Sequence, residues 1–107
     1  DWQQTAEQVD RVVRTFNPSP GAFTYFQDNL LKIWQVSVVN GRVGQPGEII
    51  AADRDGIIVA CGSGLLRIEV MQKPGGKKLN AADYLSGNSM QPGEYFAAIN
   101  HSSFEHD

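Results

Sequence analysis

The chain has 107 residues, of which 41% are hydrophobic and 20% are charged, and its net charge is −3. These values are typical of a single compact domain, residues 1–107, and exclude a disordered or fibrous protein. The acidic balance gives no general attraction to nucleic acid, so any nucleic-acid-binding surface must be a local cluster of cations. No apolar stretch reaches the ~20 residues that span a bilayer, and no signal peptide is evident, so we expect a cytoplasmic protein. The chain begins with Asp1, which suggests a piece of something longer.

The first predicted element is an amphipathic helix over residues 6–16. Thr5 and Gln8 match a capping box, in which each side chain accepts a hydrogen bond from the backbone of the other residue. Apolar residues then recur at the helical spacing i, i+3, i+4, i+7, which gathers them on one face. They are Val9, Val12, Val13 and Phe16.

A rigid proline elbow (residues 16–23) must end this helix and begin a β-rich body. Pro18 and Pro20 each fix φ and remove a backbone donor, so no helix runs through them, and the residue before each is pushed into extended geometry. Gly21 then permits a sharp redirection. We expect Phe16 and Phe23 to pack into one core from the two sides of the elbow.

Short apolar and β-branched runs separated by turn residues predict antiparallel strands over the rest of the chain. The expected strands cover residues 22–27, 30–39, 48–52, 57–61 and 65–71. In the longest one, Leu31 and Ile33 share one parity while Trp34 and Val36 share the other. Either a bulge near Ile33 and Trp34 switches the faces, or both faces are covered there. In the last strand, we expect Leu66, Ile68 and Val70 to point inward.

The fold class that these elements predict is mainly β: a small OB-like antiparallel barrel with an N-terminal amphipathic helix and a short C-terminal helix. Asn80 reads as the N-cap of that short helix, over residues 81–86, and one more extended segment is expected within residues 88–96. The domain thus divides into helix and elbow (1–21), barrel (22–96) and a loose polar tail (97–107).

The sequence offers few candidates for catalytic or metal-binding residues. His101 and His106 are the only histidines and lie in the tail, where no rigid element fixes them, so we expect no metal site. Cys61 lies in an apolar run and is expected to be a buried structural thiol. No serine, threonine or cysteine has an evident histidine partner, so we assign no catalytic residue.

The glycine- and lysine-rich loop at residues 73–78 is the main candidate for binding. It lacks the hydroxyl residue that follows the lysine in a nucleotide-binding P-loop, so triphosphate binding is rejected. Its lysines and the following helix N-terminus could hold a nucleic-acid phosphate; an ordinary solvated loop is the alternative. Candidate nucleic-acid-binding residues are Lys32, Arg42, Lys73, Lys77 and Lys78. Tryptophans are interpreted as core or interface aromatics, with Trp2 at an interface, and Met71 is placed in the core.

Seven short segments in register resemble the C-terminal domain of the methionyl-tRNA formyltransferase family, a group of folate-dependent formyltransferases. The resemblance spans residues 1 to about 96. Its pieces are Asp1-Trp2 with the helix, Asn17-Pro18-Ser19-Pro20-Gly21-Ala22-Phe23, Leu31-Lys32-Ile33-Trp34, Pro46-Gly47-Glu48-Ile49, Asp55-Gly56-Ile57-Ile58-Val59-Ala60-Cys61-Gly62, Gly76-Lys77-Lys78-Leu79, and Ala81-Ala82-Asp83-Tyr84-Leu85-Ser86-Gly87.

The resemblance implies an OB-like barrel behind a separate N-terminal catalytic domain of the same polypeptide. In that family the catalytic domain binds 10-formyltetrahydrofolate and formylates the amino group of Met-tRNA, and its reactive residues match nothing in this chain. The implied role here is to help hold initiator tRNA without catalysis and without binding a cofactor. The alternative is an auxiliary structural barrel in a formyltransferase acting on amino sugars or formyl-folate, or a free-standing binding module.

Overall fold

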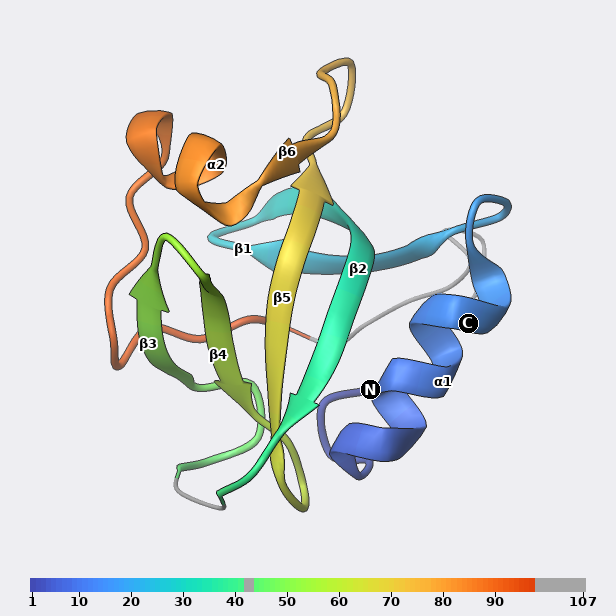
Figure 1. Ribbon diagram of the computed structural model, residues 1–107, viewed down its shortest axis with the longest axis vertical. Coiled ribbons are helices and arrows are strands. Elements are labelled where there is room, and N and C mark those ends of the chain that lie inside the picture. Colours follow the sequence, from blue (N-terminus) through green and yellow to red (C-terminus); the bar gives the residue numbers. More distant parts are fainter. Residues whose placement is uncertain (42–43, 98–107) are drawn as a thin grey trace.

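The structure, a computed structural model, describes residues 1–41 and 44–97. Two helices flank a six-stranded antiparallel sheet (Figure 1). The strands are β1 (Ala22–Phe26), β2 (Asn29–Val39), β3 (Ile49–Asp53), β4 (Gly56–Ala60), β5 (Leu65–Gln72) and β6 (Leu79–Asn80). The mainly β class and the predicted strands are confirmed, while the two-residue β6 was not predicted. Within the described part of the chain, no helix is long and apolar enough to cross a membrane.

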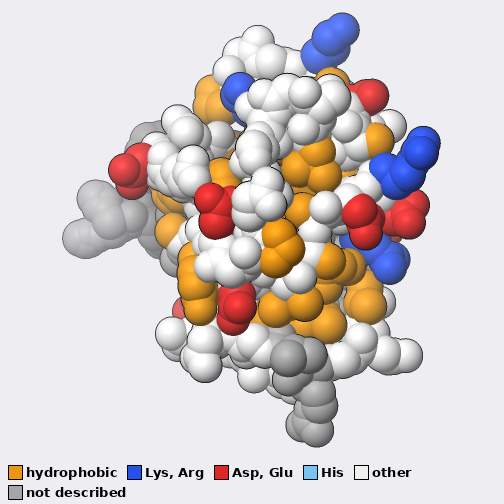
Figure 2. Space-filling view, turned by 90° about the vertical axis from the view of Figure 1, so that its left-hand side faces the viewer, with side chains coloured by type: hydrophobic (Ala, Val, Ile, Leu, Met, Phe, Trp, Pro, Cys, Tyr) orange, Lys and Arg blue, Asp and Glu red, His pale blue; other side chains and the backbone are white. Residues whose placement is uncertain are grey.

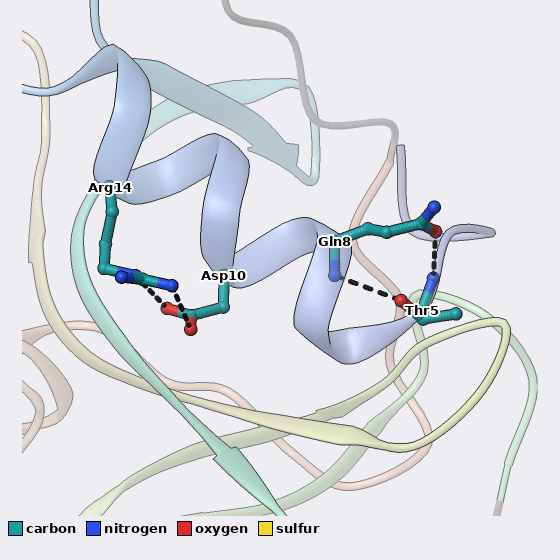
Figure 3. A network of polar contacts seen from close by, with 4 residues as sticks. All are labelled: Thr5, Gln8, Asp10 and Arg14. Atoms are coloured by element: carbon teal, nitrogen blue, oxygen red, sulfur yellow. Dashed lines mark hydrogen bonds and ion pairs between the residues drawn. The ribbon is translucent and has the colours of Figure 1, made fainter.

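Helix α1 (Ala6–Phe16) forms as predicted, and its capping box is complete. The Gln8 amide donates to Thr5 Oγ1 at 3.0 Å, and Thr5 N donates to Gln8 Oε1 at 2.9 Å (Figure 3). On the outer side, Arg14 forms an ion pair with Asp10 at 3.2 Å. Val9 and Val13 are buried, so the predicted apolar face does pack on the sheet.

The proline elbow has the extended geometry that the sequence predicts, with Asn17 at φ −84° and ψ 147°. The side-chain amide of Asn17 donates to Val13 O at 2.8 Å and to Ile33 O at 2.9 Å, which ties the end of α1 to β2. The expected packing of Phe16 and Phe23 in one core is wrong, because both side chains are only half-buried. Strand alternation explains this for Phe23: Ala22 takes the inward position, so Phe23 faces outward.

The strands follow the order β1-β2-β5-β4-β3, and a paired irregularity in the middle of the sheet reverses which residues face the core. Ile33 pairs with Met71 and Gln35 with Val70, which leaves one residue of β2 unmatched, and Val36 then pairs with Ile68, which leaves one residue of β5 unmatched. Trp34 on β2 is therefore an extra residue, and so is Glu69 on β5. Of the two alternatives that the sequence left open near Ile33 and Trp34, the bulge is the one present.

The same irregularity corrects one expectation and confirms another. Val70 was expected to point inward, but it is only half-buried, because the extra residue on β5 moves the inward position to the next side chain. Met71 takes that position and is fully buried, as predicted.

A closed barrel is not formed by the regular strands, because the edge strands β1 and β3 do not pair with each other. Residues 94–97 lie between them instead. Phe96 N donates to Gly47 O at 2.8 Å, and Ala97 N donates to Tyr25 O at 2.9 Å. The extended segment expected before residue 97 is thus present at its end, as isolated bridges to Phe26 and Glu48.

Trp2 belongs to the core and not, as expected, to an interface. It is 3% exposed, and its indole N–H donates to Thr24 Oγ1 at 3.1 Å. Its ring lies 5.7 Å from that of Phe96, which in turn lies 5.4 Å from Phe26. The indole can lie in the core because Thr24 supplies a buried hydrogen-bond acceptor, and the sequence alone does not show that these two residues meet.

Helix α2 (Ala81–Gly87) follows β6 and has the predicted cap, since Asp83 N donates to Asn80 Oδ1 at 2.9 Å. The loose tail expected at residues 97–107 falls outside the described residues after position 97, and so do His101 and His106.

Candidate nucleic-acid interface

Strand register places three side chains in a row across the outer face of β1, β2 and β5. Phe23 pairs with Lys32, and Lys32 pairs with Gln72. Cross-strand partners on one face have Cβ atoms about 4.5–5.5 Å apart, so an aromatic ring, a cation and an amide become neighbours. The side chains of Phe23 and Lys32 can pack against the backbone of Gly21 because this residue has no Cβ. An added Cβ would lie 2.8 Å from Lys32 Cε and 3.0 Å from Phe23 Cε2.

Trp34 connects this row to the lysine loop at residues 73–78. Its indole N–H donates to Gln72 Oε1 at 2.7 Å, and Gln72 Nε2 donates to Gly76 O at 2.7 Å. The bulge that makes Trp34 an extra residue of β2 also leaves it half-buried on the sheet. The loop is therefore fastened to the sheet by two short hydrogen bonds.

Lysine ammonium groups gather around the Trp34 ring. Lys32 Nζ and Lys78 Nζ each lie 4.2 Å from its centroid, within the range of cation–π attraction. Lys32 Nζ also donates to Pro18 O at 2.8 Å, and Lys73 Nζ donates to Asn88 Oδ1 at 3.0 Å. We call the six residues of this surface the basic face: Phe23, Lys32, Trp34, Gln72, Lys73 and Lys78.

The lysines of the basic face have no carboxylate partner in the part of the chain that the structure describes. Over residues 1–41 and 44–97, no carboxylate lies within 4 Å of the ammonium groups of Lys32, Lys73 or Lys78, whereas Arg14 on α1 is paired with Asp10. Their partners are a carbonyl, an amide and an aromatic ring, which position an ammonium group but leave its full charge. Such cations can neutralise phosphate.

Acidic side chains are scattered over the face that Figure 2 shows. Figure 2 shows the face over the β3 side of the molecule, with Asp and Glu side chains scattered across it between hydrophobic patches. Lys and Arg side chains lie toward the upper and right-hand edges of that view, and those at the right-hand edge lie beside Asp and Glu side chains. The net charge of −3 coexists with a cluster of lysines that, among the described residues, have no carboxylate within 4 Å.

Comparison with known proteins identifies the family. A family model described as the formyl transferase C-terminal domain matches residues 1–89. The chain belongs to this family. Among its relatives, methionyl-tRNA formyltransferase of Nitrosomonas eutropha is 53% identical over 97 residues, covering 90% of this chain and 31% of that protein. The enzyme of the same name from Geobacter metallireducens is 48% identical, covering 87% of this chain and 30% of that protein.

This formyl transferase C-terminal domain spans about a third of the length of those relatives. Its fold recurs in the crystal structure of HypX from Aquifex aeolicus in complex with tetrahydrofolic acid, with a TM-score of 0.68 and 24% sequence identity. That match covers 79% of this chain and 16% of HypX. At this identity the likeness establishes the fold alone.

The structure brings together some of the cations chosen from the sequence of this formyl transferase C-terminal domain. Lys32, Lys73 and Lys78 lie on the basic face, and Lys77 is exposed in the same loop. Arg42 lies outside the described residues. Sequence reasoning missed the noncationic members, Phe23, Trp34 and Gln72. Strand parity was the available signal for Phe23, because Ala22 and Thr24 could only be inward if Phe23 was outward.

The described part of the formyl transferase C-terminal domain offers little for catalysis. It contains no group of three or more His, Cys, Asp or Glu residues that could hold a metal ion. Cys61 is 5% exposed, and burial raises the pKa of its thiol to about 11. The thiolate, which is the nucleophilic form, is therefore scarce at neutral pH. The predicted buried, structural character of Cys61 agrees with this.

Proposed function

We propose that this chain is the non-catalytic, tRNA-positioning C-terminal domain of a methionyl-tRNA formyltransferase. The names of its relatives support the parent enzyme, and the match to about a third of their length supports a domain that works beside another. Its partners are then initiator Met-tRNA and an N-terminal catalytic domain of the same polypeptide. Formyl transfer from 10-formyltetrahydrofolate to the methionine amine takes place in that other domain, in the cytoplasm, and no cofactor binds here.

The observation that carries this proposal is the cluster of lysines around Trp34, which have no carboxylate partner among residues 1–41 and 44–97. Releasing counterions from phosphates supplies most of the affinity in backbone-directed binding, and each neutralised phosphate adds to the salt dependence. The lysine loop at residues 73–78 is fastened to β2 through Gln72, so its cations are presented on a fixed surface.

The fold supports the same role through a partly closed OB-like barrel. We propose that residues 94–97, which hydrogen-bond to Gly47 and Tyr25, complete the barrel between β1 and β3. OB folds bind oligonucleotides on the face of their central strands. The basic face lies on β1, β2 and β5 and on the loop that follows β5.

The experiment is salt-dependent binding of initiator tRNA, measured by fluorescence anisotropy over a series of salt concentrations. Changing Lys77 and Lys78 together to alanine is expected to weaken binding and to flatten the slope of log K against log salt by about 2. Arg54→Ala is the control, because Arg54 is also exposed but lies in the turn between β3 and β4. We expect this control to keep the slope.

An unchanged slope in the double variant would show that the lysine loop makes no phosphate contacts. Complete absence of tRNA binding by the unaltered protein would contradict the tRNA-positioning role itself. In that case, the auxiliary structural barrel of a formyltransferase with another substrate is the reading to test next.

A further inference from the structure

A groove of about 250 Å³ opens at the edge of the basic face. The cross-strand row forms one side of it, and the first part of the lysine loop forms the other. Its lining combines apolar surface, two cations and an amide, contributed by Phe23, Leu30, Pro74, Lys32, Lys73 and Gln72. This combination matches a ligand that has a flat apolar part, polar edges and a negative charge.

The two cations of the groove are held in place by neutral groups. Lys32 Nζ is held by Pro18 O and by the Trp34 ring, and Lys73 Nζ is held by Asn88 Oδ1 at the C-cap of α2. Little side-chain freedom remains to be lost when an anion binds between them, which lowers the entropic cost of binding.

The volume of the groove limits the ligand to one small unit. Sites for drug-sized molecules measure about 300–1,000 Å³, so this one is smaller than the usual range. A base pair is too large for it, whereas a single base is not. An aromatic ring such as Phe23 can stack only on a base whose face is exposed, and in RNA this condition is met in loops and single strands.

A second hollow, of about 550 Å³, continues from the first. Leu30, Lys73 and Pro74 line both, and the second extends to Tyr84 and Asn88 beside α2. The two hollows form a path along β2 and past the lysine loop. A strand of several nucleotides can contact both hollows along this path, whereas a free mononucleotide would occupy only one of them.

We propose that this groove binds one unpaired nucleotide of an RNA strand, with its base against the Phe23 ring and its phosphate between Lys32 and Lys73. The inference rests on the proposed tRNA-positioning function and adds to it a single-strand site beside the backbone contacts of the lysine loop. It predicts that this domain prefers unpaired RNA over duplex RNA.

The test compares a short oligouridylate with an RNA duplex of equal charge, using anisotropy and intrinsic tryptophan fluorescence. The chain has two tryptophans, and Trp2 is buried, so a fluorescence change on binding reports mainly on Trp34 beside Lys32. Phe23→Leu is expected to weaken oligouridylate binding about tenfold and to leave duplex binding unchanged, because stacking on an aromatic ring is lost. Phe23→Tyr retains the ring and should bind as the parent does.

A second variant keeps the proposal testable if Phe23→Leu proves unstable. Gln72→Glu retains an oxygen acceptor for the Trp34 indole, loses the hydrogen bond that Gln72 donates to Gly76 O, and places a negative charge in the groove. It should weaken oligouridylate binding more than duplex binding. Folding of each variant is checked by its thermal unfolding midpoint.

Equal affinity for oligouridylate and duplex, or an unchanged affinity in both Phe23→Leu and Gln72→Glu, would overturn the single-strand site. If initiator tRNA still binds with a slope that depends on Lys77 and Lys78, that failure is confined to the groove. If neither oligouridylate nor tRNA binds, the proposed function fails with it.

Discussion

The indole N–H of Trp34 on β2 donates a 2.7 Å hydrogen bond to Gln72 Oε1 at the end of β5, 38 residues further along the chain. Gln72 in turn binds the lysine loop, because its side-chain amide donates a hydrogen bond to Gly76 O. An extra residue in the middle of a strand thus positions the loop that carries the lysines. The bulge is in this sense part of the candidate site.

Trp34→Phe should loosen the lysine loop, because phenylalanine keeps an aromatic ring for the lysines but cannot donate to Gln72. We expect a loss of about 1 kcal/mol in the free energy of unfolding and faster amide hydrogen exchange in the loop. Gln35→Ala is the control, since Gln35 lies on the same strand but bonds to Glu69 and not to the loop. Unchanged exchange at Gly76 and Lys77 in Trp34→Phe would contradict this connection.

Gly21→Ala should destabilise the protein by roughly 1–3 kcal/mol, measured by denaturant unfolding. Gly21 has φ +101°, and an added Cβ would crowd Lys32 and Phe23. Gly75→Ala separates the two causes, because Gly75 also has a positive φ of +76° but has no heavy atom within 4 Å of an added Cβ. Equal losses in the two variants would show that crowding by the basic face contributes nothing.

Thr5→Ala should lower the free energy of unfolding by about 1 kcal/mol, because the Gln8 amide then lacks its acceptor at the start of α1. Gln8→Ala tests the reciprocal bond alone, since it removes the acceptor for Thr5 N and leaves the threonine cap intact. We expect the smaller loss there. A larger loss in Gln8→Ala than in Thr5→Ala would show that the hydroxyl is not the main cap.

Alkaline pH should destabilise the fold through Cys61. Burial raises the pKa of its folded-state thiol from 9.0 to about 11, so between these pH values the unfolded chain loses the proton and the folded protein keeps it. Its contribution to stability is complete below pH 9.0 and is lost as the pH rises toward about 11. Urea unfolding at a series of pH values measures this decline.

Cys61→Ala is the control for the alkaline decline and should reduce its slope. Burial also raises the pKa of the Tyr84 hydroxyl, so a smaller decline should remain in the variant. The same burial predicts that a thiol reagent modifies Cys61 of the native protein only as fast as the protein opens. Rapid labelling of the native protein, or an identical pH slope in Cys61→Ala, would contradict the buried, protonated thiol.

Features that depend on neighbours in the sequence could be predicted from it. The spacing of Val9 and Val13, the box formed by Thr5 and Gln8, and the cap at Asn80 all act within four residues along the chain. The change of parity near Trp34 could also be recognised in the sequence, because apolar residues of odd and even parity cannot lie on the same face of a regular strand. The lysines of the loop were identified by composition alone.

The tertiary structure alone decided which of these residues meet. Phe23, Lys32 and Gln72 become neighbours through strand register. The extra residues in β2 and β5 cancel in that register and decide instead which side chains face the core, and the sequence indicated only the one in β2. Trp2 enters the core because Thr24 offers a buried acceptor. Local pattern fixes helices, turns and alternation through backbone geometry, whereas the basic face arises from pairing between strands that are far apart in the sequence.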